Sequence, residues 1–298
     1  MPVKRVNGVE LFYEASGAGE PLVLVHGSWG DHHTWDPVVA PFSESFEVMV
    51  YDRRGHTQSQ RLPGQGSVDE DADDLAGLID ALESGPAHVV ANSFGSIVAL
   101  TAAIRRPDVF ATLVAHEPPL LAMLTETQFE PVLQEVNRRV GHVIELLDAD
   151  DDEAAAKLFV ETVARRPGAW EKELTAELRK VFIGNAPTFL DEARDPDSQR
   201  LDLAQLRRFD RPALLTKGTA SPPFLIAVVD AMASALPRFE VATIEGADHT
   251  PHQTTTTRYL ELVTRFVETA RVVQPSGGSP KPGISSPVTR NPPVGPHR

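Results

Sequence analysis

Apolar residues follow two alternating patterns along this chain. Short continuous apolar runs occur at 21–27, 46–52, 87–92, 109–116, 211–218 and 239–246. Between them, apolar positions recur at helical spacing over 34–42, 68–83, 96–107, 224–236 and a last segment that ends at Ala270. An unbroken apolar run indicates a strand buried on both faces, and strands that alternate with helices are typical of a parallel sheet. The pattern predicts an α/β fold with helices on both faces of a mostly parallel, doubly wound sheet.

The N-terminal segment departs from this pattern. "VKRVNG" and "VELFYEAS" alternate polar and apolar residues on either side of Asn7-Gly8. An Asn-Gly pair between two such runs predicts an antiparallel hairpin with a two-residue turn.

Residues 118–208 contain no strand pattern and are predicted to be helices punctuated by prolines. A helical insertion at this point is expected to lie over the carboxyl ends of the strands, where open parallel sheets bind ligands. We therefore expect a core made of 1–117 and 209–272 and a helical cap made of 118–208. The last segment, 273–298, is rich in proline, glycine and serine and is expected to be disordered.

The composition narrows the classes of function. The formal net charge is −14 and no basic patch offsets it, which argues against nucleic acid or a membrane as a partner. There are no cysteines, which excludes disulfides, thiolate catalysis and cysteine-based metal sites. Since the sequence has no secretory h-region and no apolar stretch long enough for a bilayer, a cytoplasmic protein is expected. The oligomeric state stays open, with a homodimer among the options.

The segment "VVANSFGSIVAL", residues 89–100, carries the strongest chemical signal. A β-branched strand leads directly into Ser93 and then into a helix, which is the setting of a nucleophile elbow. The usual pattern is G-x-S-x-G, and Ala91 stands at its first position, where only a small residue is needed. The N–H of Phe94, at the start of the helix, is expected to face a developing oxyanion.

The loop "HGSWGDHHTW", residues 26–35, is expected to supply the second oxyanion donor. Gly27 permits the turn, and the N–H of Ser28 is the natural donor. Trp29 is a candidate for lining the substrate pocket. His26 is interpreted as a histidine that braces the loop through hydrogen bonds to the backbone.

A serine nucleophile needs a base, because its hydroxyl reacts poorly at neutral pH. His249 lies in "IEGADHTPHQT", residues 244–254, between the last strand and the last helix. This places it at the same edge of the sheet as Ser93, and we predict His249 to be the base. His252, one turn later, is predicted to pack or to cap.

Four motifs occur in the order and at roughly the spacing seen in α/β-hydrolase family proteins. They are "HGSWGDHHTWDPV", "YDRRGHTQS", "ANSFGS" and "GADHTPH". The chain resembles this family over about residues 3–270, apart from the cap. The resemblance implies an α/β-hydrolase core with a triad of serine, histidine and an acid.

The position of the acid departs from the family pattern. Most members carry an aspartate after the penultimate strand, in a G-x-x-D-P turn, but this chain has "GTASP" at 218–222. Glu117 ends the strand that follows the elbow helix, within "LVAHEPPLL". Some haloalkane dehalogenases and the zearalenone-type lactonases are similar in having a glutamate there, which implies Glu117 as the triad acid. A capping role is the structural alternative for Glu117. Asp248 is the other candidate acid, although a neighbour of the base in sequence would usually point away from it.

Serine, histidine and a carboxylate together are equipped for acyl transfer. We predict a serine hydrolase that cleaves a small-molecule carboxylic ester or lactone through an acyl-enzyme, with Ser93 as nucleophile, His249 as base and Glu117 as acid. No cofactor and no metal are expected. The likeness to dehalogenases stops at the nucleophile, because halide displacement needs an aspartate. The alternatives are a ligand-binding receptor on the same fold, a perhydrolase or haloperoxidase-like enzyme, and a C–C bond hydrolase.

Overall fold

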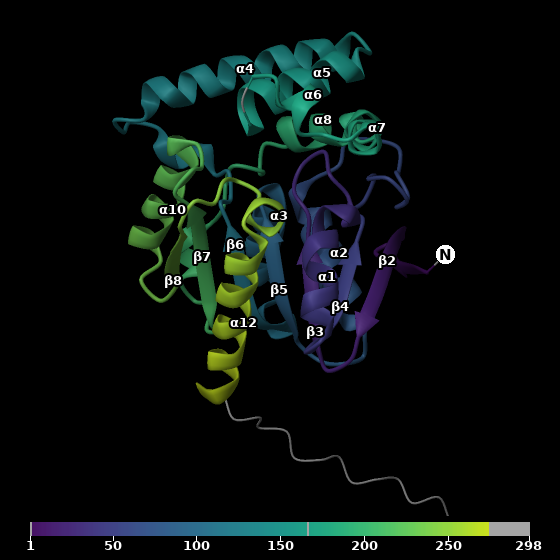
Figure 1. Ribbon diagram of the computed structural model, residues 1–298, viewed down its shortest axis with the longest axis vertical. Helices are drawn as coiled ribbons and strands as arrows, with labels where there is room; N and C mark the ends of the chain where they lie inside the picture. The colour runs from purple at the N-terminus through teal and green to yellow at the C-terminus, as the bar shows by residue number, and fades with distance from the viewer. Residues whose placement is uncertain (1, 166, 274–298) are drawn as a thin grey trace, which may run out of the picture.

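One sheet organises the protein. The structure, a computed structural model, describes residues 2–165 and 167–273. In this part of the chain eight strands form a sheet in the order β1-β2-β4-β3-β5-β6-β7-β8 (Figure 1). The strands are β1 (Val3–Val6), β2 (Val9–Gly17), β3 (Glu20–Val25), β4 (Phe46–Tyr51), β5 (Ala87–Asn92), β6 (Phe110–His116), β7 (Ala213–Gly218) and β8 (Glu240–Ile244). From β3 to β8 all pairs are parallel, whereas β1 and β2 add an antiparallel edge, so the predicted fold class is confirmed.

The antiparallel edge begins with the predicted hairpin. Val6 pairs with Val9 across a two-residue turn. Asn7 and Gly8 adopt φ values of 45° and 81°. Two consecutive positive φ values are what the right-handed twist of a tight hairpin requires, and asparagine and glycine tolerate them best.

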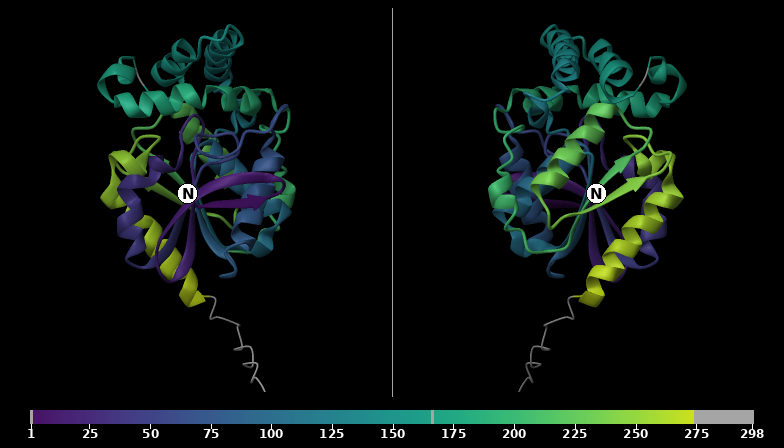
Figure 2. Two further views of the ribbon diagram at one scale, coloured as in Figure 1. Left: turned by 90° about the vertical axis from the view of Figure 1, so that its right-hand side faces the viewer. Right: turned by 90° about the vertical axis from the view of Figure 1, so that its left-hand side faces the viewer.

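Helices cover both faces of the sheet, as the apolar runs predict. Successive residues of β3 go to opposite sides: Leu22 and Leu24 join one apolar cluster, whereas Val23 and Val25 join the other. The first cluster contains α1 (Asp36–Ser43) and α12 (Thr256–Val273), and the second contains α2 (Val68–Asp80), α3 (Phe94–Arg105) and α10 (Pro223–Ala235). Figure 2 shows α10 and α12 on opposite sides of the strands.

Several helices differ from their predicted bounds. A 3-10 turn, η1 (His32–Trp35), precedes α1, because Asp31 accepts the His33 N–H and closes the turn. The terminal helix is interrupted, so that a short α11 (Pro251–Thr254) comes before α12. Helix α3 begins directly after Ser93, two residues earlier than predicted.

The insertion between β6 and β7 is helical and lies at one end of the sheet (Figures 1 and 2). Its elements are η3 (Leu121–Leu124), α4 (Glu130–Asp148), α5 (Asp152–Phe159), the π-helical turn η4 (Val160–Ala164), α6 (Ala169–Lys172), α7 (Ala176–Gly184), α8 (Ala186–Arg194) and α9 (Leu203–Leu206). Most of them share an apolar cluster of their own, but Leu206 packs in the cluster of α2 and α3. The division into core and cap at 118 and 208 stays a prediction. The predicted disordered segment lies outside the described residues from 274 onward.

None of the helices within 2–165 and 167–273 combines the length and the apolar character that crossing a bilayer demands.

Candidate active site

Ser93 stands at the turn between β5 and α3. Its φ of 56° and ψ of −128° form a backbone conformation that residues other than glycine rarely adopt. The Ser93 N–H donates to the His116 carbonyl at 2.9 Å, and the Ser93 carbonyl accepts the Ser96 N–H at 2.8 Å. These bonds hold the strained turn, as expected of a nucleophile elbow.

Glycine is required on two sides of this turn. A Cβ added to Gly95 would lie 2.4 Å from the His26 carbonyl oxygen, and one added to Gly27 would lie 2.8 Å from the Ser93 Cβ. Both distances are shorter than van der Waals contact allows. The loop that carries Gly27 is therefore packed directly against the serine.

Glu117 connects the end of β6 to the histidine loop. Its backbone leaves the strand with a φ of 46°, and its N–H donates to Thr216 O at 3.1 Å. The buried carboxylate accepts from two sides, since Oε1 lies 2.8 Å from Gly218 N and Oε2 lies 2.7 Å from His249 Nδ1. A carboxylate can only accept, so the shared proton is on His249 Nδ1, and Nε2 is the nitrogen that accepts in the neutral ring.

The carboxylate of Glu117 is held in its ionised form. Burial alone would raise its pKa, but the hydrogen bond from His249 and the neighbouring His116 and His249 rings outweigh burial, and the Ser221 hydroxyl adds to their effect. The result is a pKa of about 2. An ionised acceptor at this position keeps His249 in one tautomer and one orientation.

The two other candidate positions for the acid do not contact the His249 ring. Ser221 is buried in the loop after β7 and lies in the cavity wall. Asp248 accepts the Thr250 N–H at 2.9 Å and the Thr254 hydroxyl at 2.7 Å, so it holds the turn that leads into α11. Of the three residues, Glu117 is the one whose carboxylate reaches the imidazole.

Asn92 is a residue whose position sequence reasoning missed. Its side-chain Nδ2 donates to the His249 carbonyl at 2.9 Å, which ties the histidine loop to the residue before Ser93. The two residues are 157 positions apart. The signal that could have indicated this role is an amide side chain at the carboxyl end of a buried strand, immediately before the serine.

A cavity of about 830 Å³ lies over these residues, between the sheet and the insertion. Ser93, His249, Ser28 and Phe94 all line it. Its apolar wall comes mainly from the insertion and from the start of α10, and includes Leu133, Val136, Val140, Phe159, Val160, Val163, Leu178, Phe182, Phe189, Phe224 and Leu225. The structure therefore brings the predicted nucleophile and base to the floor of one apolar chamber.

The two predicted oxyanion donors belong to the same cavity floor. Phe94 is the first residue of α3, so its N–H has no acceptor within the helix. Ser28 precedes Trp29, whose φ of 66° turns the chain sharply after it. Both amides come from turns that flank Ser93, which suits them to a negative charge that develops beside its hydroxyl.

The interpretation of Trp29 needs correction. Trp29 is fully buried and does not line the cavity. Its ring packs against Phe159, Phe182 and Phe189 at centroid distances of 5.2, 6.4 and 4.9 Å. Those three rings do line the cavity, so Trp29 supports the wall from behind. The sharp turn after Ser28 directs the indole into the insertion.

His26 braces its loop, as predicted. Its Nε2 accepts the Arg53 N–H at 3.0 Å, so Nδ1 carries the proton and donates to Gly27 O at 2.8 Å. Burial lowers the pKa of His26 to about 3, which keeps the ring neutral. His252 also packs as predicted: its ring is tilted by 35° against that of Trp35, with the centroids 4.3 Å apart, and burial lowers its pKa well below the ordinary value.

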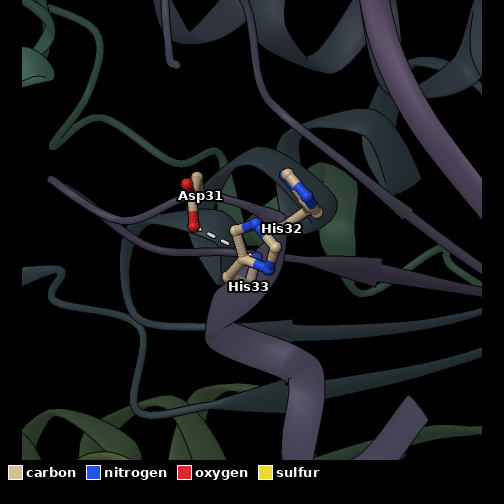
Figure 3. A group of neighbouring side chains, drawn as sticks. All are labelled: Asp31, His32 and His33. Atoms are coloured by element: carbon tan, nitrogen blue, oxygen red, sulfur yellow. Dashed lines mark hydrogen bonds between the residues drawn. The ribbon is translucent and has the colours of Figure 1, made fainter. Parts of the chain in front are cut away.

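Within residues 2–165 and 167–273, two groups of side chains have donor atoms close enough to hold a metal ion. One is His116, Glu117 and His249, whose inner bonds are described above. The other is Asp31, His32 and His33, grouped in the loop before α1 (Figure 3).

The atoms of the second group already have partners within the protein. Asp31 accepts the His33 N–H at 3.1 Å and the Thr57 hydroxyl at 3.2 Å. His32 Nδ1 lies 2.7 Å from Asp52 Oδ1. These contacts fasten the loop that carries Ser28, and we assign the group to that bracing role.

A family model described as "alpha/beta hydrolase fold" matches residues 20–254. The chain belongs to the alpha/beta hydrolase fold family. The match spans both Ser93 and His249 and includes the helical insertion. The protein is thus a hydrolase of the alpha/beta fold.

The individual relatives are either distant in sequence or similar to only part of this chain. The chain is 23% identical to 2-(acetamidomethylene)succinate hydrolase of Mesorhizobium japonicum over 88% of this chain and 93% of that protein. It is 32% identical to the uncharacterized hydrolase YraK of Bacillus subtilis, but over only 40% of this chain and 45% of that protein.

Solved structures of this family share the fold. A thermophilic esterase from Thermogutta terrifontis superimposes with a TM-score of 0.73 at 23% identity, over 91% of this chain and 99% of that one. The enol-lactonase from Burkholderia xenovorans gives a TM-score of 0.70 at 23% identity, over 90% of this chain and 100% of that one. At such low sequence identities the similarity establishes the fold but does not identify the substrate.

Proposed function

We propose that this protein is a serine hydrolase that cleaves a carboxylic ester or a lactone through an acyl-enzyme. The observation that carries the proposal is the contact of 2.7 Å between Glu117 Oε2 and His249 Nδ1, on the floor of the cavity that Ser93 also lines. An ionised carboxylate that fixes an imidazole tautomer beside a strained serine is the arrangement that activates a hydroxyl for attack on a carbonyl.

The proposed reaction gives every residue of the site a defined part. Ser93 Oγ attacks the carbonyl carbon while its proton passes to His249 Nε2, and the carbonyl oxygen becomes an oxyanion near the N–H groups of Ser28 and Phe94. Collapse of this intermediate breaks the bond to the leaving oxygen, which takes the proton from His249. Glu117 stabilises the imidazolium between these steps. Water then attacks the acyl-enzyme with His249 again as base, which releases the acid and restores Ser93.

The cavity supports a substrate with a sizeable apolar part. Its volume of about 830 Å³ lies in the range of pockets that hold drug-sized molecules, and its upper wall is mainly aliphatic and aromatic. The esterase and the enol-lactonase that share this fold are named for the same two bond types as the proposal.

A second candidate is cleavage of an amide-type C–N bond. The relative that matches along nearly the whole chain is named for hydrolysis of an acetamidomethylene compound. A serine triad with an oxyanion hole also serves amide substrates, because the first step is the same attack on a carbonyl carbon.

A substrate panel with matched variants tests the proposal. The purified protein is assayed with p-nitrophenyl esters and lactones of graded acyl length, together with p-nitroanilides of the same acyl groups. We expect turnover of esters or lactones by the unmodified chain and none above background by Ser93→Ala. Ser221→Ala, which also removes a hydroxyl from the cavity wall, serves as the control and should remain active.

Labelling by a fluorophosphonate separates the enzyme from the ligand-binding alternative. The unmodified chain should take up the probe at Ser93, and Ser93→Ala should not. A protein that resists the probe, shows no turnover and still binds an ester or lactone tightly would contradict the proposal and favour a receptor. Turnover of anilides without turnover of esters or lactones would favour the second candidate.

A further inference from the structure

A fully buried arginine lies beside both proposed oxyanion donors, and no step of the proposed reaction uses it. Arg53 follows β4 and has no exposed surface. Its guanidinium lies 5.1 Å from the centre of the Phe94 ring, and its Nη2 lies 3.5 Å from Gly27 O. A buried guanidinium is retained only where carboxylates or other acceptors compensate its charge.

Two carboxylates provide that compensation. Arg53 Nη1 contacts Asp71 Oδ2 of α2 at 3.0 Å, and Nη2 pairs with Glu192 of α8. Asp71 belongs to α2, which covers one face of the sheet, whereas Glu192 comes from the insertion and lines the cavity. Arg53 is thus held between the core and the insertion, in a fixed position relative to both.

The contact with Gly27 matters because of the geometry of the peptide group. Gly27 O and Ser28 N belong to one planar peptide, in which a trans C=O and N–H point in opposite directions. His26 Nδ1 donates to Gly27 O at 2.8 Å. Arg53 Nη2, which also contacts Glu192 and His56 Nε2, lies 3.5 Å from the same oxygen, and the two groups together hold the plane of this peptide. Donation to a carbonyl also polarises the peptide and strengthens the N–H at its other end as a donor.

The same guanidinium touches the second donor residue. Its position over the Phe94 ring fixes the side chain at the first turn of α3, next to the amide that flanks Ser93. One cation therefore restrains the two turns whose N–H groups must converge on a single oxygen atom.

We propose that Arg53 is a positioning residue for the oxyanion hole: held by Asp71 and Glu192, it orients the Gly27–Ser28 peptide and the Phe94 turn toward the transition state. The inference rests on the proposed function, because it assigns a role within that reaction. Arg53 itself does not touch the substrate. Replacing Arg53 should therefore weaken stabilisation of the transition state and hardly change the affinity for the substrate.

Arg53→Lys is the decisive variant, since lysine keeps the charge but cannot hold Gly27, Asp71 and Glu192 at once. Arg54→Lys is the matched control, because Arg54 also pairs with carboxylates, Glu70 and Asp74, but makes no contact with Gly27. Each variant is assayed for kcat and KM on the best p-nitrophenyl ester. Each is also titrated with a trifluoromethyl ketone of the same acyl chain, which adds to Ser93 and forms an oxyanion, and with the unreactive methyl ketone.

For Arg53→Lys we expect kcat to fall on the order of 10- to 100-fold, less than the 10²–10³ for outright loss of a donor, with KM within about threefold. Binding of the trifluoromethyl ketone should weaken by a similar factor, and binding of the methyl ketone should not change. Arg54→Lys should match the unmodified chain in all four measurements.

Equal behaviour of the Arg53→Lys and Arg54→Lys variants would overturn the inference, as would equal weakening of both ketones. If Arg53→Lys does not fold, Asp71→Asn takes its place, since it removes the anchor of Arg53 that does not line the cavity and hardly changes the side-chain volume. It should weaken trifluoromethyl ketone binding relative to methyl ketone binding, and no such difference would again overturn the inference. Absence of Ser93-dependent turnover in the unmodified chain is a different result, which would refute the proposed function itself.

Discussion

Two adjacent strands, β6 and β7, end at the same edge of the sheet, and the turns that follow them contribute differently to the hydrogen bonds around His249. The turn after β6 presents the Glu117 carboxylate, whose Oε2 lies 2.7 Å from His249 Nδ1. The turn after β7 has Ser221 where related proteins carry the acid, and it contributes the Gly218 N–H, 2.8 Å from Glu117 Oε1. The β7 turn therefore supports the proposed acid, Glu117, instead of supplying an acid of its own.

In the proposed triad, the position of the acid in space matters, and the strand that carries the acid does not. Neighbouring parallel strands are about 4.8 Å apart, a gap that a glutamate side chain can cross. A carboxylate on either strand can reach the same imidazole, provided that its other oxygen also finds a donor.

The largest effect should follow from neutralising the β6 turn. In Glu117→Gln the amide cannot stabilise the imidazolium and allows the wrong tautomer of His249, so kcat should fall on the order of 10³–10⁴-fold. Steady-state kinetics on the best p-nitrophenyl ester measure this loss. Near-normal rates in Glu117→Gln would mean that another group serves as the acid.

The same substitution should also reveal a pH-dependent stability. The pKa of Glu117 is about 2 in the folded protein against an ordinary 4.5, so its ionised form stabilises the fold above pH 4.5, and this contribution is lost as the pH falls toward 2. The unmodified chain should exceed Glu117→Gln in free energy of unfolding by up to about 3 kcal/mol near pH 6, and the gap should close below pH 3. Denaturant unfolding at a series of pH values measures the gap, and a gap independent of pH would contradict the assigned pKa shift.

Moving the acid to the β7 turn should restore part of the lost activity. Adding Ser221→Asp to Glu117→Gln returns a carboxylate to the cavity edge, and we expect kcat to recover about tenfold, since an imperfect position still costs about 10². The single variant Ser221→Asp controls for general damage. No recovery in a folded double variant would show that the β7 turn cannot place a carboxylate beside His249.

Removing the Ser221 hydroxyl should have the smallest effect. Ser221 lowers the pKa of Glu117 only as the last of several causes, so Ser221→Ala should change kcat by less than about tenfold. The assay used for Glu117→Gln measures it. A loss as large as that of Glu117→Gln would mean that both turns are needed equally.

The elements of the core could be predicted because their causes are local. Runs such as 87–92 are apolar without interruption, and this pattern is strong wherever both faces of a strand are buried. The start of α3 was misplaced by two residues because the strained turn at Ser93 passes into the helix with no capping side chain to mark the boundary.

The site was predictable where one motif carries the chemistry and not where distant residues combine. Ser93 is recognisable within six residues of sequence. Trp29 was misjudged because an aromatic residue in an active-site loop has the same appearance in sequence whether its ring faces a cavity or packs behind the wall. Asn92 and Arg53 were missed because their partners, His249 and Glu192, are 157 and 139 positions away.

The sequence by itself determined the alternation of strands and helices, the elbow at Ser93 and the ionisable groups that could act, because each depends on neighbours within a few residues. Only the tertiary structure decided which of them meet. Whether a carboxylate at 117 reaches an imidazole at 249 depends on the order of β6 and β7 in the sheet and on the Gly218 N–H between them. Such contacts are set by the packing of the whole sheet, and no local pattern of residues encodes them.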